Sequence, residues 1–459
     1  MAKKKIDMCN GPLFSGIIRH TVPIILTSIL QLLFNAADLV VVGRFCGSVS
    51  VAAVGATGSL TNLIVNLFIG LSVGCGVSVA QAIGARDDET THRTVHTAIP
   101  AAIVSGVVLT IIGVSLSETF LGWMGTPQNV IELSAVYMKL YFCGMTFNMV
   151  YNFGASILRA AGDTKGPLIY LSSAGVINVI LNVVLVTKFD MNVAGVALAT
   201  AISQGISAVL VIIALMRRPD ACRFSFKKMH FYSVQLKKML AIGIPAGIQG
   251  SLFSISNVII QSSINSFGDV LMSGNAAAGN IEGFVYVLMN AFHQSALNFT
   301  GQNVGAMNYK RVKKTLLICL GCVTIAGLAA GGVVYLFGEQ LLSIYITDSP
   351  EAIAYGMTRL SLICLPYFLC GLMDTTTGAI RGMGVSLSPM VITILGVCVF
   401  RIGWVYTIFQ IPQFHTPSCL YLSYTISWSV TFLIELLAFF IIYKKRITKV
   451  KPSANLTVE

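Results

Sequence analysis

The sequence predicts an all-α integral membrane protein with twelve transmembrane helices, arranged as two pseudo-symmetric six-helix lobes in a parallel tandem repeat. Three observations predict this fold class: a scarcity of charge, a series of long apolar stretches, and landmarks that recur at one spacing. Of the 459 residues, 55% are hydrophobic and only 10% are charged. Ordinary soluble domains carry about 25% charged residues. The composition therefore excludes a soluble enzyme and a disordered scaffold.

Twelve apolar stretches are each long enough to cross a bilayer as a helix, which takes about 20 residues. Lipid offers the backbone no hydrogen bonds, and the stretches lack the alternation of barrel strands, so we expect helices. The basic start is followed by no small-residue cleavage site, which predicts an uncleaved first span. The expected spans are 16–42, 52–80, 95–117, 133–158, 168–188, 193–216, 239–265, 273–300, 315–337, 353–379, 388–410 and 419–443.

The two halves of the chain repeat three landmarks at an offset of 221 or 222 residues. Each half holds six expected spans, so the halves keep one orientation, as in transporters built from parallel repeats. We therefore expect an N-lobe at 1–216, a basic cytoplasmic linker at 217–238 and a C-lobe at 239–459. The landmarks are the Gln-x-x-Gly-Ala turns at Gln81 and Gln302, the Arg-x-x-Gly turns at Arg159 and Arg381, and the prolines Pro23 and Pro245.

The formal net charge of +12 follows the expected topology. Lys and Arg gather on alternate loops, with seven in 217–238 and five from Lys444 to Lys451. By the positive-inside rule, both termini are expected in the cytoplasm. The expected partners are therefore the lipid bilayer and small-molecule substrates rather than nucleic acid, and we expect a monomer. The Cys319–Cys322 pair lies in an apolar stretch and indicates packing, with no metal site.

Polar side chains in the first-half spans are candidate functional residues, because a charge at the bilayer centre costs about 2.5–3.5 kcal/mol. Gln31, Asn35 and Asp38 share one helical face at i, i+4 and i+7. Asn178 and Asn182 are spaced i, i+4 in the fifth span. Amide oxygens can bind Na⁺ or accept from a protonated carboxyl. The alternatives are a solvated helix end for Asp38 and interhelical packing contacts for the amides.

The second half carries a further set of candidates for a cavity wall. Asn257 and Gln261 belong to a stripe of amides in the seventh span, where contacts between helices are the alternative. His293 in the eighth span has two interpretations: it carries a proton during transport, or it is a neutral, hydrogen-bonded side chain. Asp374 in the tenth span could instead pair with Arg359 or Arg401. Glu282 and Tyr286 share a face with His293. Glu435 in the twelfth span has no polar neighbours at helical spacing and receives no role.

No motif of hydrolytic or nucleotide-driven enzymes occurs in the sequence: it has no H-E-x-x-H, no G-x-S-x-G and no P-loop. We expect no enzyme activity and no cofactor. Without ATP to drive transport, the energy must come from an ion gradient or from the gradient of the substrate.

The paired turns and the aspartate near the end of the first span resemble the multidrug and toxic compound extrusion (MATE) family, over roughly residues 15–445. The resemblance implies an N-lobe cation site of Asp38, Asn178, Asn182 and Thr200. Relatives often have Asp where Asn182 stands, so this chain has one carboxylate fewer and the coupling ion stays open. The carboxylates of a C-lobe Na⁺ site are missing, although Asp374 lies one turn from one of their expected positions.

The resemblance implies a bacterial inner-membrane antiporter that exports organic, lipophilic cations in exchange for H⁺ or Na⁺. One alternative is a lipid-linked oligosaccharide flippase of related architecture. It would need cationic side chains in the cavity, for which Lys139, Arg359 and Arg401 are the intramembrane candidates. The other alternative is a polar-solute channel, which would conduct without ion coupling.

Overall fold

The computed structural model describes residues 6–347 and 349–450, and this part of the chain is built from helices without a strand. Ten helical segments are long and apolar enough to span a bilayer, and two of them, Pro350–Gly382 and Leu387–Gln410, each run through several labelled helices. The helices α4 (Gln128–Cys143) and α5 (Met145–Ala160) form an eleventh span, bent by 45°. The remaining predicted span lies in α9 (Asp269–Gly305), which has 37 residues but is more polar. The predicted all-α membrane fold is confirmed.

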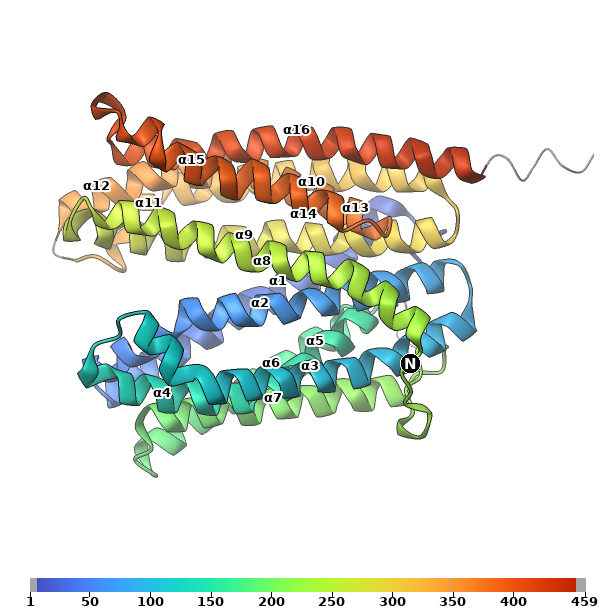
Figure 1. Cartoon of the computed structure of the whole chain (residues 1–459), viewed down its shortest axis with the longest axis horizontal. Coiled ribbons are helices and arrows are strands. Elements are labelled where there is room, and N and C mark those ends of the chain that lie inside the picture. Colours follow the sequence, from blue (N-terminus) through green and yellow to red (C-terminus); the bar gives the residue numbers. More distant parts are fainter. Residues whose placement is uncertain (1–5, 348, 451–459) are drawn as a thin grey trace, which may run out of the picture. The chain divides into compact units, whose positions relative to one another are not determined.

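One compact unit comprises Val22–Ser251 with the short stretch ending at Asp7. Its central helix, α5, packs against α2, α3 and α7 (Figure 1). Apolar side chains such as Phe142, Met149 and Phe153 form its buried core. The helices of this unit are α1 (Leu13–Phe45) from Val22 onward, α2 (Ser48–Gly84), α3 (Asp88–Trp123), α4, α5, α6 (Lys165–Thr187), α7 (Asn192–Met216), the short η1 (Phe226–Lys228) and the first part of α8 (Ser233–Asn265).

The other compact unit comprises Met8–Thr21 and the chain from Leu252 onward. Its central helix, α13 (Phe368–Gly382), packs against α9, α10 and α16 (Figure 1). Two π-helical segments, η2 (Leu360–Cys364) and η4 (Ile394–Val399), interrupt its spans. The other elements are α10 (Tyr309–Leu336), α11 (Gly338–Ser343), α12 (Pro350–Arg359), η3 (Leu365–Tyr367), α14 (Leu387–Thr393), α15 (Phe400–Tyr406), η5 (Ile408–Gln410), η6 (Pro412–Phe414) and α16 (Pro417–Val450).

The units divide the chain differently from the lobes predicted at 1–216 and 239–459, because the division falls inside α1 and α8. The start of α1 joins the second unit, where Asn303 donates to the carbonyl oxygen of Met8 over 3.1 Å. The start of α8 joins the first unit, since a Cβ on Gly247 would lie 2.0 Å from the carbonyl oxygen of Leu67 in α2. Backbones can approach this closely only where a glycine leaves room.

Backbone conformation recurs at the same spacing as the sequence landmarks. Gly162 after α5 and Gly384 after α13 have φ angles of 82° and 83°, in the left-handed region that favours glycine. Arg86 after α2 and Met307 after α9 have φ angles of 56° and 54°. The repeated turns therefore have the same local structure in both units.

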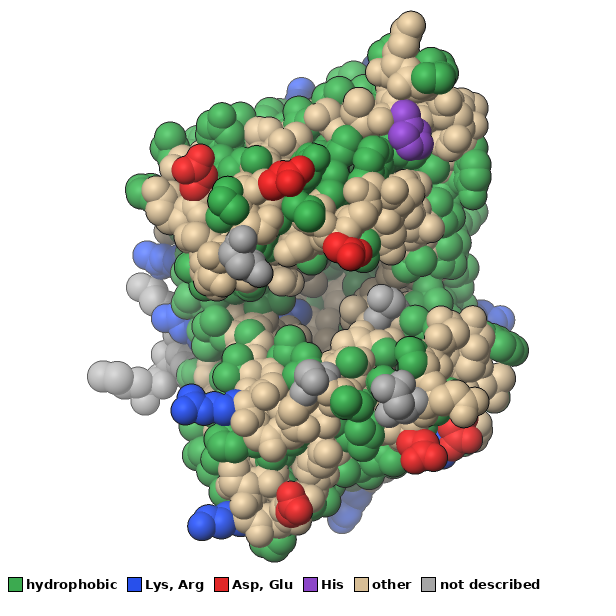
Figure 2. All heavy atoms as spheres, turned by 90° about the vertical axis from the view of Figure 1, so that its left-hand side faces the viewer, with side chains coloured by type: hydrophobic (Ala, Val, Ile, Leu, Met, Phe, Trp, Pro, Cys, Tyr) green, Lys and Arg blue, Asp and Glu red, His purple; other side chains and the backbone are tan. Residues whose placement is uncertain are grey.

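Apolar side chains are exposed on the outer faces of the spans. Val176 and Ile180 on α6 are each 57% exposed, and Ile325 on α10 is 73% exposed. Figure 2 looks onto the helix ends from the left-hand side of Figure 1 and shows mostly apolar and uncharged side chains, with a few separate acidic ones. The exposed apolar side chains along the helices, such as Val176, Ile180 and Ile325, suit contact with lipid. Together with the long apolar helices, they make this a multi-pass membrane protein.

Candidate functional site

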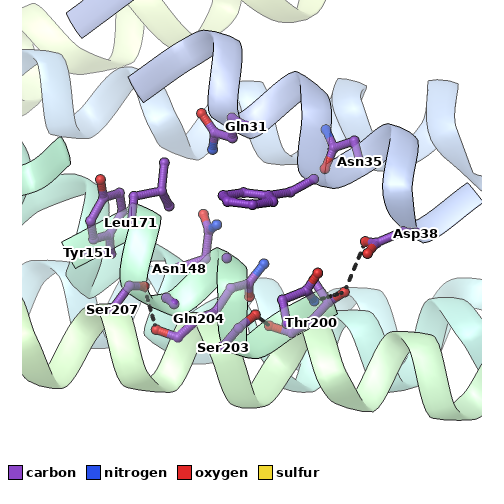
Figure 3. A pocket seen from close by; sticks show the side chains of 14 residues that line it. Gln31, Asn35, Asp38, Asn148, Tyr151, Leu171, Thr200, Ser203, Gln204 and Ser207 are labelled. Atoms are coloured by element: carbon purple, nitrogen blue, oxygen red, sulfur yellow. Dashed lines mark hydrogen bonds between the residues drawn. The ribbon is translucent and has the colours of Figure 1, made fainter. Parts of the chain in front are cut away.

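A cavity in the first unit opens between α1, α5, α6 and α7, and with its open side it encloses about 560 Å³. Figure 3 shows Gln31, Asn35 and Asp38 of α1 pointing towards polar side chains of the facing helices. The cavity is lined by Gln31, Phe34, Asn35, Asp38, Asn148, Tyr151, Leu171, Ala174, Gly175, Asn178, Thr200, Ser203, Gln204 and Ser207. Asp38 is its one acidic lining residue.

Four of the predicted site residues close a ring of hydrogen bonds at the end of this cavity. Asn182 donates to Oδ1 of Asp38, and the Thr200 hydroxyl lies 3.4 Å from Oδ2. Asn182 also lies 3.3 Å from Oδ1 of Asn178, whose Nδ2 in turn lies 3.3 Å from the Thr200 hydroxyl. The sequence thus brings α1, α6 and α7 together around one carboxyl group.

The helix geometry explains how the ring forms. Asn178 and Asn182 are one turn apart, so both amides leave α6 on the same buried face. The opposite face of α6 carries the exposed side chains of Val176 and Ile180. On α1, Asp38 lies one turn beyond Phe34, whose ring packs so closely on α6 that a Cβ on Gly175 would lie 1.8 Å from it. This glycine lets α1 approach α6 and brings Asp38 to the amides.

The ring offers the chemistry of a proton or a monovalent cation site. A carboxyl group provides the charge, while the amides and the hydroxyl provide neutral oxygens. Oδ1 of Asn182 is buried and has no hydrogen-bond partner among the described residues. It could accept from a protonated carboxyl or bind a cation. In the described part of the chain, no three His, Cys, Asp or Glu side chains gather as a metal cluster.

The structure adds residues that sequence reasoning did not select. Asn148 and Tyr151 of α5, together with Ser203, Gln204 and Ser207 of α7, line the same cavity. The i, i+4 spacing of Asn148 and Asn152 was a usable signal, since Asn152 donates to Asn148 over 2.9 Å. Ser203, Gln204 and Ser207 share one face of α7, yet hydroxyl and amide side chains are common in membrane helices for packing alone. Their position beside the cavity is visible only in three dimensions.

Glu282, predicted as a cavity residue, lies in a buried ion pair of the second unit. Its Oε2 accepts from Nη2 of Arg359 over 2.6 Å and from Nε over 3.1 Å. Asn275 accepts from the same guanidinium over 2.5 Å, and Tyr421 donates to Asn275 over 3.2 Å. Both charged side chains are nearly buried, at 11% and 13% exposure. The carboxylate therefore neutralises a buried cation.

The other predicted residues of the second unit lie at separate places. Asn257 and Gln261 are exposed on α8, and Gln261 bonds to Asn265 over 2.8 Å and to Asn275 over 3.0 Å. Tyr286 is 42% exposed on α9, whereas His293 is 8% exposed.

Nδ1 of His293 lies 2.7 Å from the backbone carbonyl oxygen of Asp374. The sequence suggests Arg359 or Arg401 as a possible ion-pair partner of Asp374. In the structure, the cation that acts on the Asp374 carboxylate is Arg381 of the same helix.

Two buried ionisable groups of the second unit have partners that helical spacing could not reveal. Glu435 has no exposed surface and contacts hydroxyls from two other helices. Arg401 is 2% exposed, with its guanidinium 3.9 Å from the ring centre of Tyr424, and it donates to Ser427 over 2.9 Å. The isolated appearance of Glu435 in the sequence was misleading because its neighbours come from distant parts of the chain.

This chain is similar to known proteins over most of its length. The MatE family model matches residues 23–184 and residues 245–407, once in each half. The "Probable multidrug resistance protein YpnP" of Bacillus subtilis is 26% identical over 398 residues, covering 87% of this chain and 89% of that protein. The "Multidrug export protein MepA" of Staphylococcus saprophyticus is 20% identical over 387 residues, covering 84% of this chain and 85% of that protein.

Solved structures share the fold. One described as "Crystal structure of MATE in complex with MaL6" aligns with a TM-score of 0.90 at 21% identity, covering 97% of this chain and all of that chain (100%). A multidrug resistance MATE family transporter of the MOP superfamily, in an outward-facing conformation, aligns with a TM-score of 0.89 at 21% identity, covering 98% of this chain and 100% of that chain. The two family matches, together covering well over half of the sequence, assign the protein: the chain belongs to the MatE family.

Proposed function

We propose that this protein is a secondary antiporter that exports organic, lipophilic cations in exchange for H⁺ or Na⁺. The observation that carries the proposal is the hydrogen-bonded ring around Asp38 in the wall of a polar cavity whose other lining side chains are uncharged. The relatives named as multidrug resistance and multidrug export proteins support the export of drugs.

The exchange follows from the single carboxyl group of the cavity. When Asp38 is ionised, its negative charge attracts a cationic substrate into the cavity. When Asp38 holds H⁺ or Na⁺, that attraction is lost and the substrate is released. Because the carboxylate can be neutralised by only one partner at a time, binding of ion and substrate is mutually exclusive. A carrier with this property exchanges one for the other across the membrane.

The remaining cavity wall suits substrates that are large and weakly hydrated. Phe34 and Tyr151 offer aromatic surface, which attracts organic cations through the ring face. Asn148 and Gln204 offer amides that can donate to or accept from varied groups. Most lining residues carry polar groups, while Phe34, Leu171 and the ring of Tyr151 add apolar surface, so the wall offers both kinds of contact to a substrate.

The proposed location is the bacterial plasma membrane, with both termini in the cytoplasm. The basic loops support this orientation, since the segment 217–238 alone holds seven Lys and Arg residues.

The flippase alternative receives no comparable support. It needs unpaired cations for a pyrophosphate group, whereas Lys139 bonds to Glu118 over 2.5 Å. Arg359 is neutralised by Glu282. Arg401 is only 2% exposed and packs against the ring of Tyr424, so it does not present its charge to a large anionic group. The channel alternative would leave the ring around Asp38 without a purpose.

The proposal is tested in proteoliposomes by following efflux of ethidium under a pH gradient and a Na⁺ gradient imposed separately. Efflux driven by one of the two gradients, above that of protein-free liposomes, is the expected result and identifies the ion. If neither gradient drives ethidium or another organic cation, the proposal is wrong.

A further inference from the structure

We propose that Glu435 is a second proton-binding carboxyl group, located in the second unit, which releases and rebinds its proton during transport. The inference extends beyond the proposed ion site at Asp38: proton binding by Glu435 stands by itself, whereas its role in transport rests on the proposed antiport. Glu435 lies on α16, fully buried, where α13 and α14 pack against that helix.

The first argument is a count of hydrogens. The Thr393 hydroxyl lies 2.7 Å from the carbonyl oxygen of Pro389 and 2.8 Å from Oε1 of Glu435. Both neighbours are acceptors when Glu435 is ionised, yet a hydroxyl has one hydrogen to donate. Both contacts become hydrogen bonds if Glu435 carries a proton on Oε1 and donates it to Thr393. Thr377 lies 2.7 Å from Oε1 and 2.8 Å from Oε2, and it donates its one hydrogen to the carboxyl group. With the proton on Glu435, both contacts of the Thr393 hydroxyl therefore hold a hydrogen.

The second argument is a count of charges. The charged groups that act on Glu435 are Asp374 and Arg381, both on α13. On α9, the titratable side chains near Arg381 are Tyr286 and His293. A protonated tyrosine and a neutral histidine add no charge to this group. With Glu435 ionised, two carboxylates face one guanidinium, and the group carries a net negative charge although Glu435 itself has no exposed surface. A proton on Glu435 makes the group neutral, which is the less costly state inside a membrane protein.

A third observation comes from the seam between α16 and η4. Thr431 lies one turn before Glu435 on α16, and its buried hydroxyl has no hydrogen-bond partner among the described residues. Its oxygen would lie 2.3 Å from a Cβ placed on Gly396 of η4, so it faces the same seam as Thr393. An unsatisfied hydroxyl next to a proton-carrying carboxyl is a place for the proton, or a water that carries it, to go next.

Release of the proton changes the local structure in a defined way. The carboxyl group becomes a carboxylate and H⁺ leaves. Thr393 then turns its hydrogen from Pro389 towards Oε1. The negative charge left behind needs water or a closer approach of Arg381. The two protonation states therefore favour different packing of α16 against α13 and α14, and a transport cycle alternates between such states.

Proton binding is tested by infrared spectroscopy of the purified protein, which detects the C=O band of protonated carboxyl groups. Glu435→Gln should remove one such band component near neutral pH, whereas Asp38→Asn should leave that component in place. If Glu435→Gln removes no protonated-carboxyl signal, Glu435 is ionised and the inference is wrong. This readout needs no transport, so it separates this inference from the proposed antiport.

The role in transport is tested by efflux as a function of pH. Glu435→Gln keeps the neutral shape but cannot release a proton, so we expect at least tenfold slower efflux with unchanged ethidium binding. Thr393→Val should shift the pH profile without abolishing efflux. Thr376→Val is the matched control, because Thr376 bonds only to the Leu372 carbonyl among the described contacts. Wild-type efflux and pH dependence in Glu435→Gln would show a purely structural role and overturn the inference.

Discussion

Asn182 of α6 donates its side-chain N–H to Oδ1 of Asp38 in α1, and this contact joins two helices that are distant in the sequence. Because Asn182 also reaches Asn178, which reaches Thr200, the charge on Asp38 is linked to α6 and α7. A proton or a cation at Asp38 changes what these amides can donate to. If Asp38 binds the coupling ion as proposed, the ring links ion binding to the packing of α1, α6 and α7.

Replacing Asp38 tests whether its charge drives exchange. Asp38→Asn keeps the size of the side chain but removes its charge, and we expect gradient-driven ethidium efflux to fall at least tenfold. The measurement is efflux from proteoliposomes. Asp190→Asn is the matched control, because Asp190 is exposed beyond the end of α6 and asparagine tolerates its φ of 52°. Equal losses in both variants would contradict a special role for Asp38.

Replacing Asn182 tests the contact itself. Asn182→Ala leaves Oδ1 of Asp38 without its amide donor, and a hydrogen bond to a charged group is worth about 1.5–3 kcal/mol. At 1.4 kcal/mol per decade, coupled efflux should fall roughly 10- to 150-fold. Asn178→Ala keeps the donor and should cost less. An Asn182→Ala variant as active as Asn178→Ala would show that the contact is unimportant.

The shape of the cavity depends on Gly175. A methyl group there would lie 1.8 Å from the ring of Phe34, so Gly175→Ala must displace this ring from the cavity wall. Such overpacking costs about 1–3 kcal/mol. We expect altered relative efflux of large and small organic cations. Gly205→Ala on α7 is the control, since its methyl group would make ordinary contact at 3.8 Å with Phe147. An unchanged substrate profile in Gly175→Ala would rule out this wall as a determinant.

The buried pair of Arg359 and Glu282 should matter for stability. Arg359→Met leaves a buried carboxylate without its cation, which costs about 3–5 kcal/mol. The double variant Arg359→Met with Glu282→Gln removes both charges and should recover most of the loss. Thermal unfolding in detergent measures this. If the double variant is stable but does not transport, the pair takes part in transport, and Glu282 belongs to the cavity wall as predicted from the sequence.

The cap of α3 predicts a pH effect with a definite sign. Asp87 accepts from the backbone N–H of Thr90 over 2.8 Å, and hydrogen bonds from Thr90 lower the pKa of Asp87. Since the folded-state pKa is below the unfolded value of about 3.9, the cap stabilises at neutral pH. This stabilisation is lost as the pH falls through the folded-state pKa.

The repeat provides the control for this cap. Asn308 holds the equivalent position before α10 and accepts from the backbone N–H of Arg311 over 3.3 Å. The destabilisation by Asp87→Ala should therefore shrink on acidification, whereas that by Asn308→Ala should not. Thermal unfolding across pH measures both. A pH-independent effect of Asp87→Ala would contradict the assigned charge.

Much of the fold followed from the sequence because a bilayer requires long apolar helices. The positions of the spans and of the repeat agree with the prediction, including the span at 273–300, which lies in the more polar α9. The bend at Gly144 and the π-helical segments η2 and η4 were not, because they depend on packing between helices rather than on composition.

The candidate site was predictable only in part. Asp38, Asn178 and Asn182 stood out as polar residues at helical spacing, but their meeting with Thr200 came from a family resemblance. Asn148 and Gln204 join the cavity from other helices, which one-dimensional spacing cannot reveal. Glu435 shows the same limit, since its partners Thr377 and Thr393 lie 58 and 42 residues away.

The most direct measurement uses the ethidium gradient as the driving force and follows the ion that moves in exchange. Proteoliposomes are loaded with ethidium, the membrane potential is clamped, and the movement of H⁺ and of Na⁺ is followed as ethidium leaves. The account predicts that one of these ions moves opposite to ethidium in the wild type and that this movement disappears in Asp38→Asn. Ethidium flow without ion movement, or ion movement that persists in Asp38→Asn, would contradict it.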